Sequence, residues 1–149
     1  MSNTTTADAR ATYATYKETP HAKRRAYLEH CDHLAAWTAA AEAGSAEACF
    51  LVGKCHGEGI LTPVDTLTAF RFYKIGAELG DVYCQSNLSG LYERGEGCAQ
   101  DPEAAFHWRE KAAKQGSLAA MHNLGLNYFF GQYVTVDFQR AREWFIKAL

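Results

Sequence analysis

The chain has 149 residues, of which 48% are hydrophobic and 21% charged, and its formal net charge is −2. This balance is typical of one soluble globular domain with a real hydrophobic core. The near-neutral charge excludes the basic surface that nucleic acids and anionic lipids require, and no apolar run is long enough to span a membrane. We therefore expect neither a nucleic acid nor a membrane as partner.

The number and spacing of the cysteines indicate the cellular compartment. They are odd in number and form no C-x-x-C pair, which is typical of reduced, mostly buried thiols in a cytosolic protein. The N-terminus shows no secretory signal, although a mature chain whose leader had been removed would look the same. We expect a cytoplasmic protein whose free thiols are Cys31, Cys49, Cys55, Cys84 and Cys98.

Residues 1–44 predict two helices. The first covers about residues 9–16, with Tyr13 and Tyr16 on one face. Thr19-Pro20 is typical of a cap and first position for the second, which we expect to continue to the end of this segment. We interpret residues 1–44 as an N-terminal helical cap with a degenerate half repeat, because terminal units of helical arrays are usually atypical.

A short cluster of metal-ligand residue types lies inside this cap. His30 and His33 are three residues apart, so both can face one side of a helix, with Cys31 beside them and Cys55 further on. No fourth ligand follows at a spacing typical of zinc sites. We therefore predict no metal and no cofactor, and keep a metal- or redox-responsive protein only as an alternative.

After the cap, a repeat of 36 residues runs to the end of the chain without an insertion. Six positions recur in one register, which marks a repeat architecture. This spacing divides residues 45–149 into units 45–80, 81–116 and 117–149. The recurring sets are Gly44, Gly80 and Gly116; Gly59, Gly95 and Gly131; Asp65, Asp101 and Asp137; Ala69, Ala105 and Ala141; Val52, Leu88 and Leu124; and Phe72, Trp108 and Trp144.

Each unit predicts two helices joined by a short loop. A Ser or Asp after the first glycine can cap the first helix, the second glycine can end it, and the recurring Asp can cap the second helix. Small residues at Gly53, Ser89 and Gly125 leave room for close helix packing. Since a two-helix unit cannot bury its apolar stripe alone, the units must stack into an array.

The middle unit carries a specific pattern made of Asn87-Leu88, Tyr92, Gly95-Glu96-Gly97, Gln100-Asp101, Ala105, Trp108, Lys111-Ala112-Ala113 and Gln115-Gly116. With these residues it resembles the Sel-one-like repeat, a branch of the tetratricopeptide-like superfamily. Three residues depart from that pattern, namely His56, Ser89 and Tyr133. The resemblance covers residues 45–149 and implies an all-α, right-handed α/α solenoid of about three 36-residue two-helix repeats with the N-terminal cap.

In such arrays the first helices line a concave groove where ligands bind, so the resemblance places the partner-binding residues there. Aromatic and arginine side chains are enriched in binding hot spots, although a groove phenylalanine can equally pack against neighbouring helices. The groove candidates are Glu47, Phe50, Lys54, Tyr83, Ser86, Asn87, Glu93, Arg94, Ala119, His122, Leu126, Phe129 and Phe130.

The last helix is expected to carry exposed apolar residues. In the middle unit the outer positions are Arg109 and Glu110, whereas the last unit has Phe145 and Ile146 there. A large exposed apolar patch usually marks an interface. Trp144, Phe145, Ile146 and Leu149 are therefore candidates for contact with a second copy in a homodimer.

No catalytic motif is present: there is no phosphate loop after a strand, no nucleophile elbow and no metalloprotease helix. We therefore predict a non-catalytic adaptor or scaffold that binds a protein or peptide in the groove. The alternative from another class is a structural module that self-associates through its C-terminal helix.

Overall fold

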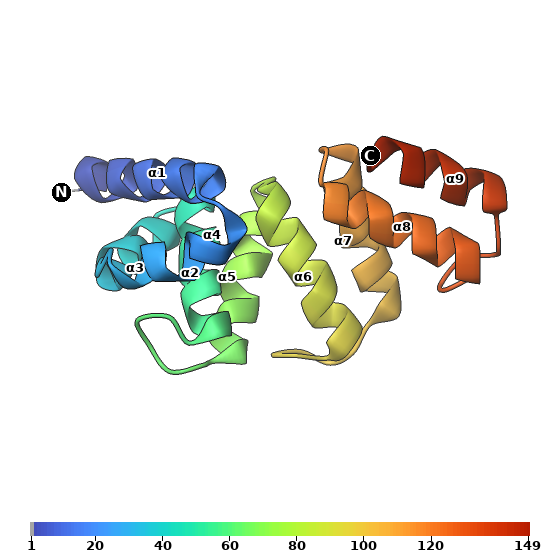
Figure 1. The fold of residues 1–149 in the computed structure, drawn as a ribbon. Helices are drawn as coiled ribbons and strands as arrows, with labels where there is room; N and C mark the ends of the chain where they lie inside the picture. The colour runs from blue at the N-terminus through green and yellow to red at the C-terminus, as the bar shows by residue number, and fades with distance from the viewer. Residues whose placement is uncertain (1) are drawn as a thin grey trace.

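The computed structural model describes residues 2–149, with side chains from residue 6 onward, and this part of the chain is entirely helical. Figure 1 shows the helices following one another from the N-terminal group to the red C-terminal helix. Within the described residues, none of the helices is both long and apolar enough to cross a membrane. The helices are α1 (Ser2–Glu18), α2 (Arg24–Glu29), α3 (Leu34–Glu42), α4 (Ala46–Glu58), α5 (Thr66–Glu78), α6 (Val82–Arg94), α7 (Pro102–Lys114), α8 (Leu118–Phe130) and α9 (Phe138–Lys147).

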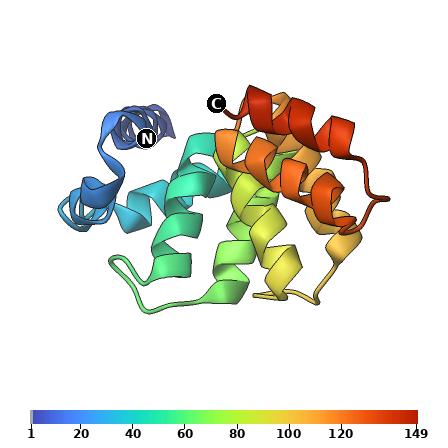
Figure 2. The same cartoon turned by 45° about the vertical axis from the view of Figure 1, so that its right-hand side comes forward.

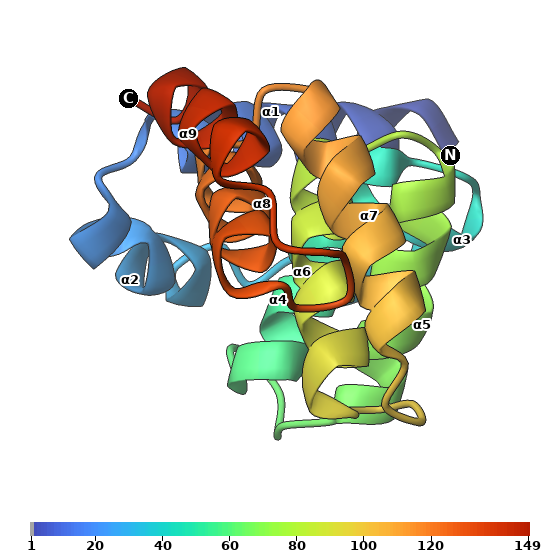
Figure 3. The same cartoon turned by 90° about the vertical axis from the view of Figure 1, so that its right-hand side faces the viewer.

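Three antiparallel pairs, α4–α5, α6–α7 and α8–α9, form the repeat array, and each pair packs against the next. Figure 3 shows α6 and α7 side by side, with α8 and α9 stacked next to them. Because each helix buries one stripe against the helix before it and the helix after it, the core continues from unit to unit. The all-α solenoid is confirmed.

The predicted helix boundaries of the repeat are confirmed by the cap geometry. The side chains of Ser45, Asp81 and Ser117 accept hydrogen bonds from the third amide of α4, α6 and α8. The glycines that end these helices have φ angles of +66°, +67° and +68°, which L side chains rarely adopt. The departure at Tyr133 leaves the loop geometry unchanged, because its φ of +64° matches that of Gly97 at +70°.

The N-terminal cap differs from its prediction after the first helix. The expected helix lies within α1, but the continuous second helix is wrong: the chain forms a short turn at His21–Lys23, then α2 and α3. Asp32 has a φ of +40° between α2 and α3, which breaks the helix. The Thr19 amide and hydroxyl both donate to the Thr15 carbonyl, at 2.9 and 2.7 Å, so Thr19 closes the end of α1 and its hydroxyl does not cap the next helix.

Close helix packing depends on the small residues of the first helices. A Cβ atom at Gly53 would lie 2.8 Å from the Tyr73 ring, and one at Gly125 would lie 2.5 Å from the Phe145 ring. The glycines are therefore required where a large side chain of the second helix crosses the first. This confirms the predicted role of the small residues.

Candidate functional site

The helices α4, α6 and α8 occupy equivalent places in the three units and share one face, which we call the groove face. We define it by two sets of positions that are 36 residues apart. These are Glu47, Tyr83 and Ala119, and Phe50, Ser86 and His122. Figure 2 shows α1 at one end of the array and α8–α9 at the other, so the two ends of the groove face have different surroundings.

The first unit's part of the groove face is covered by α1. The rings of Tyr13 and Tyr16 lie 5.5 and 5.2 Å from that of Phe50, centroid to centroid. Arg10 forms an ion pair with Glu47 at 3.7 Å. Phe50 is only 2% exposed, so the expectation that it lies open to a partner is wrong. Its place is in the core, beneath two tyrosines of the chain's own first helix.

Tyr13 connects α1 to the second unit as well. Its hydroxyl donates a hydrogen bond to Oδ2 of Asp81, the residue that caps α6. Its ring lies 6.0 Å from the ring of Tyr83. Burial, and then the bond to Asp81, raise the pKa of the Tyr13 hydroxyl well above its usual value. Tyr13 is therefore a fixed part of the junction between the first two units.

The next junction, between α6 and α8, is open on the groove face. A cavity of about 460 Å³ lies there. Ser86 and Ser117 share a hydrogen bond of 3.1 Å between their hydroxyls, and the Gln115 amide donates to Gln85 at 2.7 Å. Hydroxyl and amide groups thus stand beside apolar side chains, a mixture typical of ligand sites. The lining residues are Val82, Tyr83, Ser86, Gln115, Gly116, Ser117, Leu118 and Ala119.

The cavity brings together three of the predicted groove residues, Tyr83, Ser86 and Ala119. The sequence reading missed Val82, Gln115 and Leu118, which come from the helix starts and the loop before α8. These three residues could be found from the sequence, because they flank the recurring glycine and cap positions. Side chains at helix starts face whatever lies across the junction, and only the assembled array shows what that is.

At the other end of the same junction a buried arginine joins α6, α7 and α8. Arg109 is 4% exposed; its guanidinium donates to Oδ1 of Asn127 at 2.7 Å and pairs with Glu93 at 2.8 Å. The expectation that Arg109 faces outward is wrong. It occupies the position of Tyr73 and Phe145, and points into the junction.

Three other groove candidates are engaged locally. Lys54 forms an ion pair with Glu58 on the same helix. The Asn87 amide donates to the Tyr83 carbonyl at 2.8 Å. Arg94 is exposed and makes two hydrogen bonds to Glu96, at 2.9 and 3.1 Å, which lower the pKa of that carboxyl. Binding by these three residues stays a prediction.

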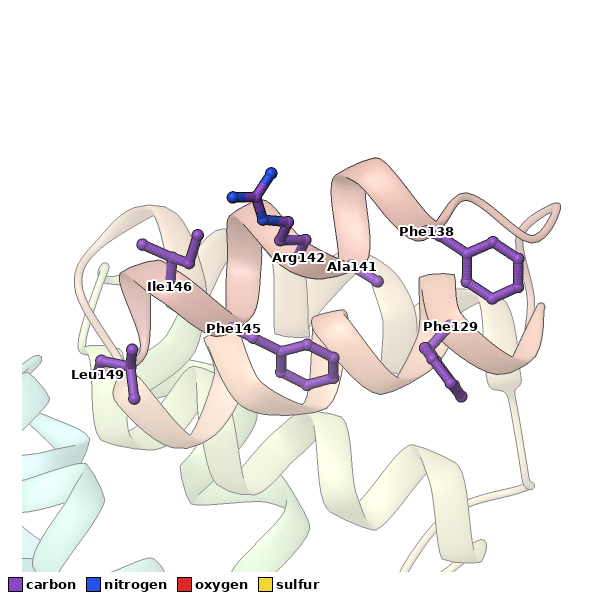
Figure 4. A pocket seen from close by; sticks show the side chains of 7 residues that line it. All are labelled: Phe129, Phe138, Ala141, Arg142, Phe145, Ile146 and Leu149. Carbon is purple, nitrogen blue, oxygen red and sulfur yellow. The ribbon is translucent and has the colours of Figure 1, made fainter.

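The C-terminal edge carries the apolar residues that the sequence predicts there. Phe129 stacks edge-on against Phe130 and Phe138, with centroids 5.0 and 5.4 Å apart. Figure 4 shows the side chains around an apolar hollow of about 320 Å³. Phe130 is 63% and Ile146 55% exposed. The residues lining this hollow are Phe129, Phe138, Ala141, Arg142, Phe145, Ile146 and Leu149.

The four candidates for self-association are not equally free. Trp144 is partly buried in the core of the last unit, with the Lys147 ammonium 4.5 Å from its ring centroid. Phe145 is partly buried against Gly125, and the His122 ring lies 5.6 Å from it. Only Ile146 and Leu149 stand clear of their neighbours. A contact with a second copy stays a prediction, now centred on these two.

The arrangement needed for the metal alternative is absent from the described residues. No group of three or more His, Cys, Asp or Glu lies close enough there to hold a metal. His30 and His33 flank the break between α2 and α3, so they do not share a helix face. Cys31 is half-buried and donates to the Tyr27 carbonyl at 3.3 Å, while burial raises the pKa of Cys55 to about 12. Such a thiol is unreactive at neutral pH.

Comparisons with known proteins agree with this architecture. A structure of a Sel1 repeat protein from Oxalobacter formigenes shares 29% identity over 77% of this chain and 33% of its own, with a TM-score of 0.74. A protective antigen of uropathogenic Escherichia coli strains, described as having an SLR fold, shares 26% identity over 91% of this chain and 32% of its own, also with a TM-score of 0.74.

A sequence relative comes from a eukaryote. Chitin synthase regulatory factor 2 of Schizosaccharomyces pombe is 35% identical over 89 residues, which make up 59% of this chain and 17% of that protein. The chain thus spans a third or less of the length of these relatives. The family model of the Sel1 repeat matches residues 46–81, 82–117 and 118–149. Each match starts one residue after the unit deduced from the glycine spacing, and the chain belongs to the Sel1 repeat family.

Proposed function

We propose that the chain is a non-catalytic adaptor that binds a protein or peptide on the groove face between α6 and α8. Sel1 repeat proteins mediate protein–protein interactions, and the relative in S. pombe is named as a regulatory factor. The observation that carries the proposal is the cavity of about 460 Å³ on this face, beside the part that α1 covers. The free thiols favour a cytoplasmic place of action.

A preformed groove of this kind suits a flexible partner. The helices of the array are held by their own core and are already ordered. Most of the entropy lost on binding is therefore lost by the peptide. His122 is exposed on α8, and the half-buried Leu126 lies one turn further along the helix, beside Glu93 and Arg109. A carboxylate placed at either position would face a docked partner.

The test is a pulldown from lysate of the source organism with a variant that carries His122→Glu and Leu126→Glu. We expect the wild type to retain a specific partner and the variant to lose it. A matched control carries His107→Glu and Leu67→Glu, two exposed positions on α7 and α5, and should retain the partner. Circular dichroism checks that both variants fold. If both variants retain the same partner, the contact lies elsewhere and the proposal fails.

A second candidate function rests on the apolar hollow at the C-terminal edge. Two copies of α9 that bury Ile146 and Leu149 against each other would form a symmetric contact. Light scattering at high protein concentration tests it, with Ile146→Glu as the variant. A dimer that dissociates in this variant supports self-association, and a wild-type monomer at every concentration rejects it.

A further inference from the structure

The site that holds the Tyr13 side chain, which we call the Tyr13 seat, shows how a helix binds on this groove face. The Tyr13 ring lies against Phe50 of α4 and Tyr83 of α6, and its hydroxyl donates to Asp81 at the start of α6. Three elements thus make the seat: a side chain from each of two successive first helices and a polar cap residue at its end. The occupant is a tyrosine presented by a helix.

The repeat carries this seat to the next junction. A shift of 36 residues converts Phe50 into Ser86, Tyr83 into Ala119, and Asp81 into Ser117. All three of these residues line the cavity between α6 and α8. The cavity is therefore the second copy of the Tyr13 seat, and no side chain of the described chain occupies it.

The second seat differs from the first in size and keeps a polar end. Ser86 and Ala119 replace two aromatic side chains, which leaves room for a large ring. Val82 and Leu118 supply apolar contacts at the helix starts. The Ser117 hydroxyl, which already accepts an amide hydrogen bond at the start of α8, stands where Asp81 accepts the Tyr13 hydroxyl. An aromatic ring with a hydroxyl at its tip matches these groups.

We propose that this cavity receives a tyrosine side chain from a helix of the partner protein. This helix packs on α6 and reaches α8 through its tyrosine, as α1 packs on α4 and reaches α6 through Tyr13. The inference rests on the proposed function and specifies it, because it names the class of segment that is recognised: an amphipathic helix with an exposed tyrosine. The chain's own α1 is the internal example of such a ligand.

The first test uses p-cresol, the side-chain analogue of tyrosine, and backbone amide NMR of the full chain. We expect saturable shifts at Ser86, Ser117 and Ala119, and binding about threefold weaker for toluene, which lacks the hydroxyl. Ala119 is exposed, so Ala119→Tyr adds a ring at the cavity without disturbing the fold. In the first junction the Phe50 ring, 5.4 Å away, supports Tyr83, whereas beside the small Ser86 the new ring can turn into the cavity and fill it. This variant should weaken p-cresol binding about tenfold.

Two controls test the polar end of the cavity and the place of binding. Ser117→Asp copies the cap of α6, keeps an N-cap residue and should strengthen p-cresol binding. Ile146→Glu, in the hollow at the C-terminal edge, should leave it unchanged. The proposal is overturned if p-cresol shifts nothing near the cavity, if it shifts only the C-terminal hollow, or if Ala119→Tyr binds it as the wild type does.

The second test uses a peptide with the sequence of residues 6–18 and its Tyr13→Ala variant. We expect the wild-type peptide to bind, the variant to bind at least about fivefold more weakly, and Ala119→Tyr in the protein to abolish binding. Binding that Ala119→Tyr leaves intact would mean exchange with the resident α1, which contradicts the inference.

The pulldown separates this inference from the function on which it depends. A partner lost by the His122→Glu, Leu126→Glu variant but retained by Ala119→Tyr would leave the groove function standing and reject the tyrosine seat. A partner retained by both would reject the groove function.

Discussion

The middle repeat and the two outer repeats fill the same place in the core with opposite chemistry. In the outer units an aromatic ring, Tyr73 or Phe145, crosses a glycine of the first helix. In the middle unit this place belongs to Arg109, whose charge is paired with Glu93 and Asn127. At the equivalent position of the first helix the middle unit has Ser89 instead of a glycine, because a guanidinium needs less room there than an aromatic ring.

The Arg109 junction shows that several positions of the repeat change together. A buried charge is strongly unfavourable unless its partners are buried with it. Arg109 therefore needs Glu93 of its own unit, where the outer units have Gly57 and Phe129. It also needs Asn127 of the last unit, where the first and middle units have Cys55 and Leu91. The departure at Ser89 is thus explained by the arginine that this junction holds.

Removing the guanidinium gives the largest expected effect. Arg109→Met keeps the aliphatic stem and leaves Asn127 and Glu93 without their donor. Because Glu93 is partly exposed, we expect a loss of about 2–3 kcal/mol in the free energy of unfolding, below the full value for a buried pair. Urea denaturation followed by circular dichroism measures it. Arg71→Met, which removes an exposed pair to Glu42, is the matched control and should lose far less.

Converting the Arg109 junction to the aromatic type should restore most of the stability that the loss of the arginine removes. We expect the triple variant Ser89→Gly, Arg109→Phe and Asn127→Leu to recover most of the stability that Arg109→Phe alone loses, about 2 kcal/mol. The three changes restore the ring, the glycine beneath it and an apolar neighbour. Urea denaturation of the single and triple variants measures the recovery. Equal losses in the two would mean that the concerted change is not what the fold requires.

The glycines of the outer units should respond unequally to alanine. At Gly53 the new Cβ meets the buried Tyr73 ring, so we expect Gly53→Ala to lose about 1–2 kcal/mol, even after the gain in helix propensity. At Gly125 the half-buried Phe145 can swing outward, so Gly125→Ala should lose less. Ser89→Ala, in the middle unit, should be the mildest. Thermal unfolding ranks the three, and a loss at Gly125 that exceeded the one at Gly53 would contradict the packing argument.

Alkaline pH should weaken the first unit. Burial raises the pKa of Cys49 to about 11 and of Cys55 to about 12, from an ordinary 9.0. Because the folded state holds these protons more tightly, stability is intact below pH 9 and falls as the pH rises through the folded pKa values, by about 1 kcal/mol per thiol at pH 10. Urea denaturation at pH 8 and pH 10 measures the fall.

Cys49→Ala should reduce that loss. Cys98→Ala, which removes a less buried thiol, should reduce it less. Stability that is equal at pH 8 and pH 10 in the wild type would contradict the assignment of these thiols to the core.

The architecture could be predicted from the sequence because it follows from local rules that recur. The caps at Ser45, Asp81 and Ser117, with the glycines that end the same helices, mark every boundary of the array within a residue or two. The helix break at Asp32 could not be predicted in this way. No proline or glycine marks it, and it depends on how α2 and α3 pack against the rest of the cap.

The site was harder to predict, because it depends on contacts between distant parts of the chain. Tyr13 and Tyr16 were recognised as one face of a helix, but nothing local to them says that the face covers Phe50. For Arg109 the sequence predicts a surface position, because arginine is usually exposed. The middle unit has Ser89 and Arg109 where the outer units have a glycine and an aromatic residue. This paired difference is the sequence feature that indicates an inward-pointing arginine.

The placement of α1 also bears on how long a partner that binds on the groove face, as proposed, would stay bound. With the first junction occupied, the open part of the groove face within the described residues spans α6 and α8, which would accommodate about three turns of a bound helix. An interface of that size lies at the low end for protein complexes, where dissociation is fast. A lasting association would then require several such contacts at once, so that avidity rather than the strength of one contact sets the residence time.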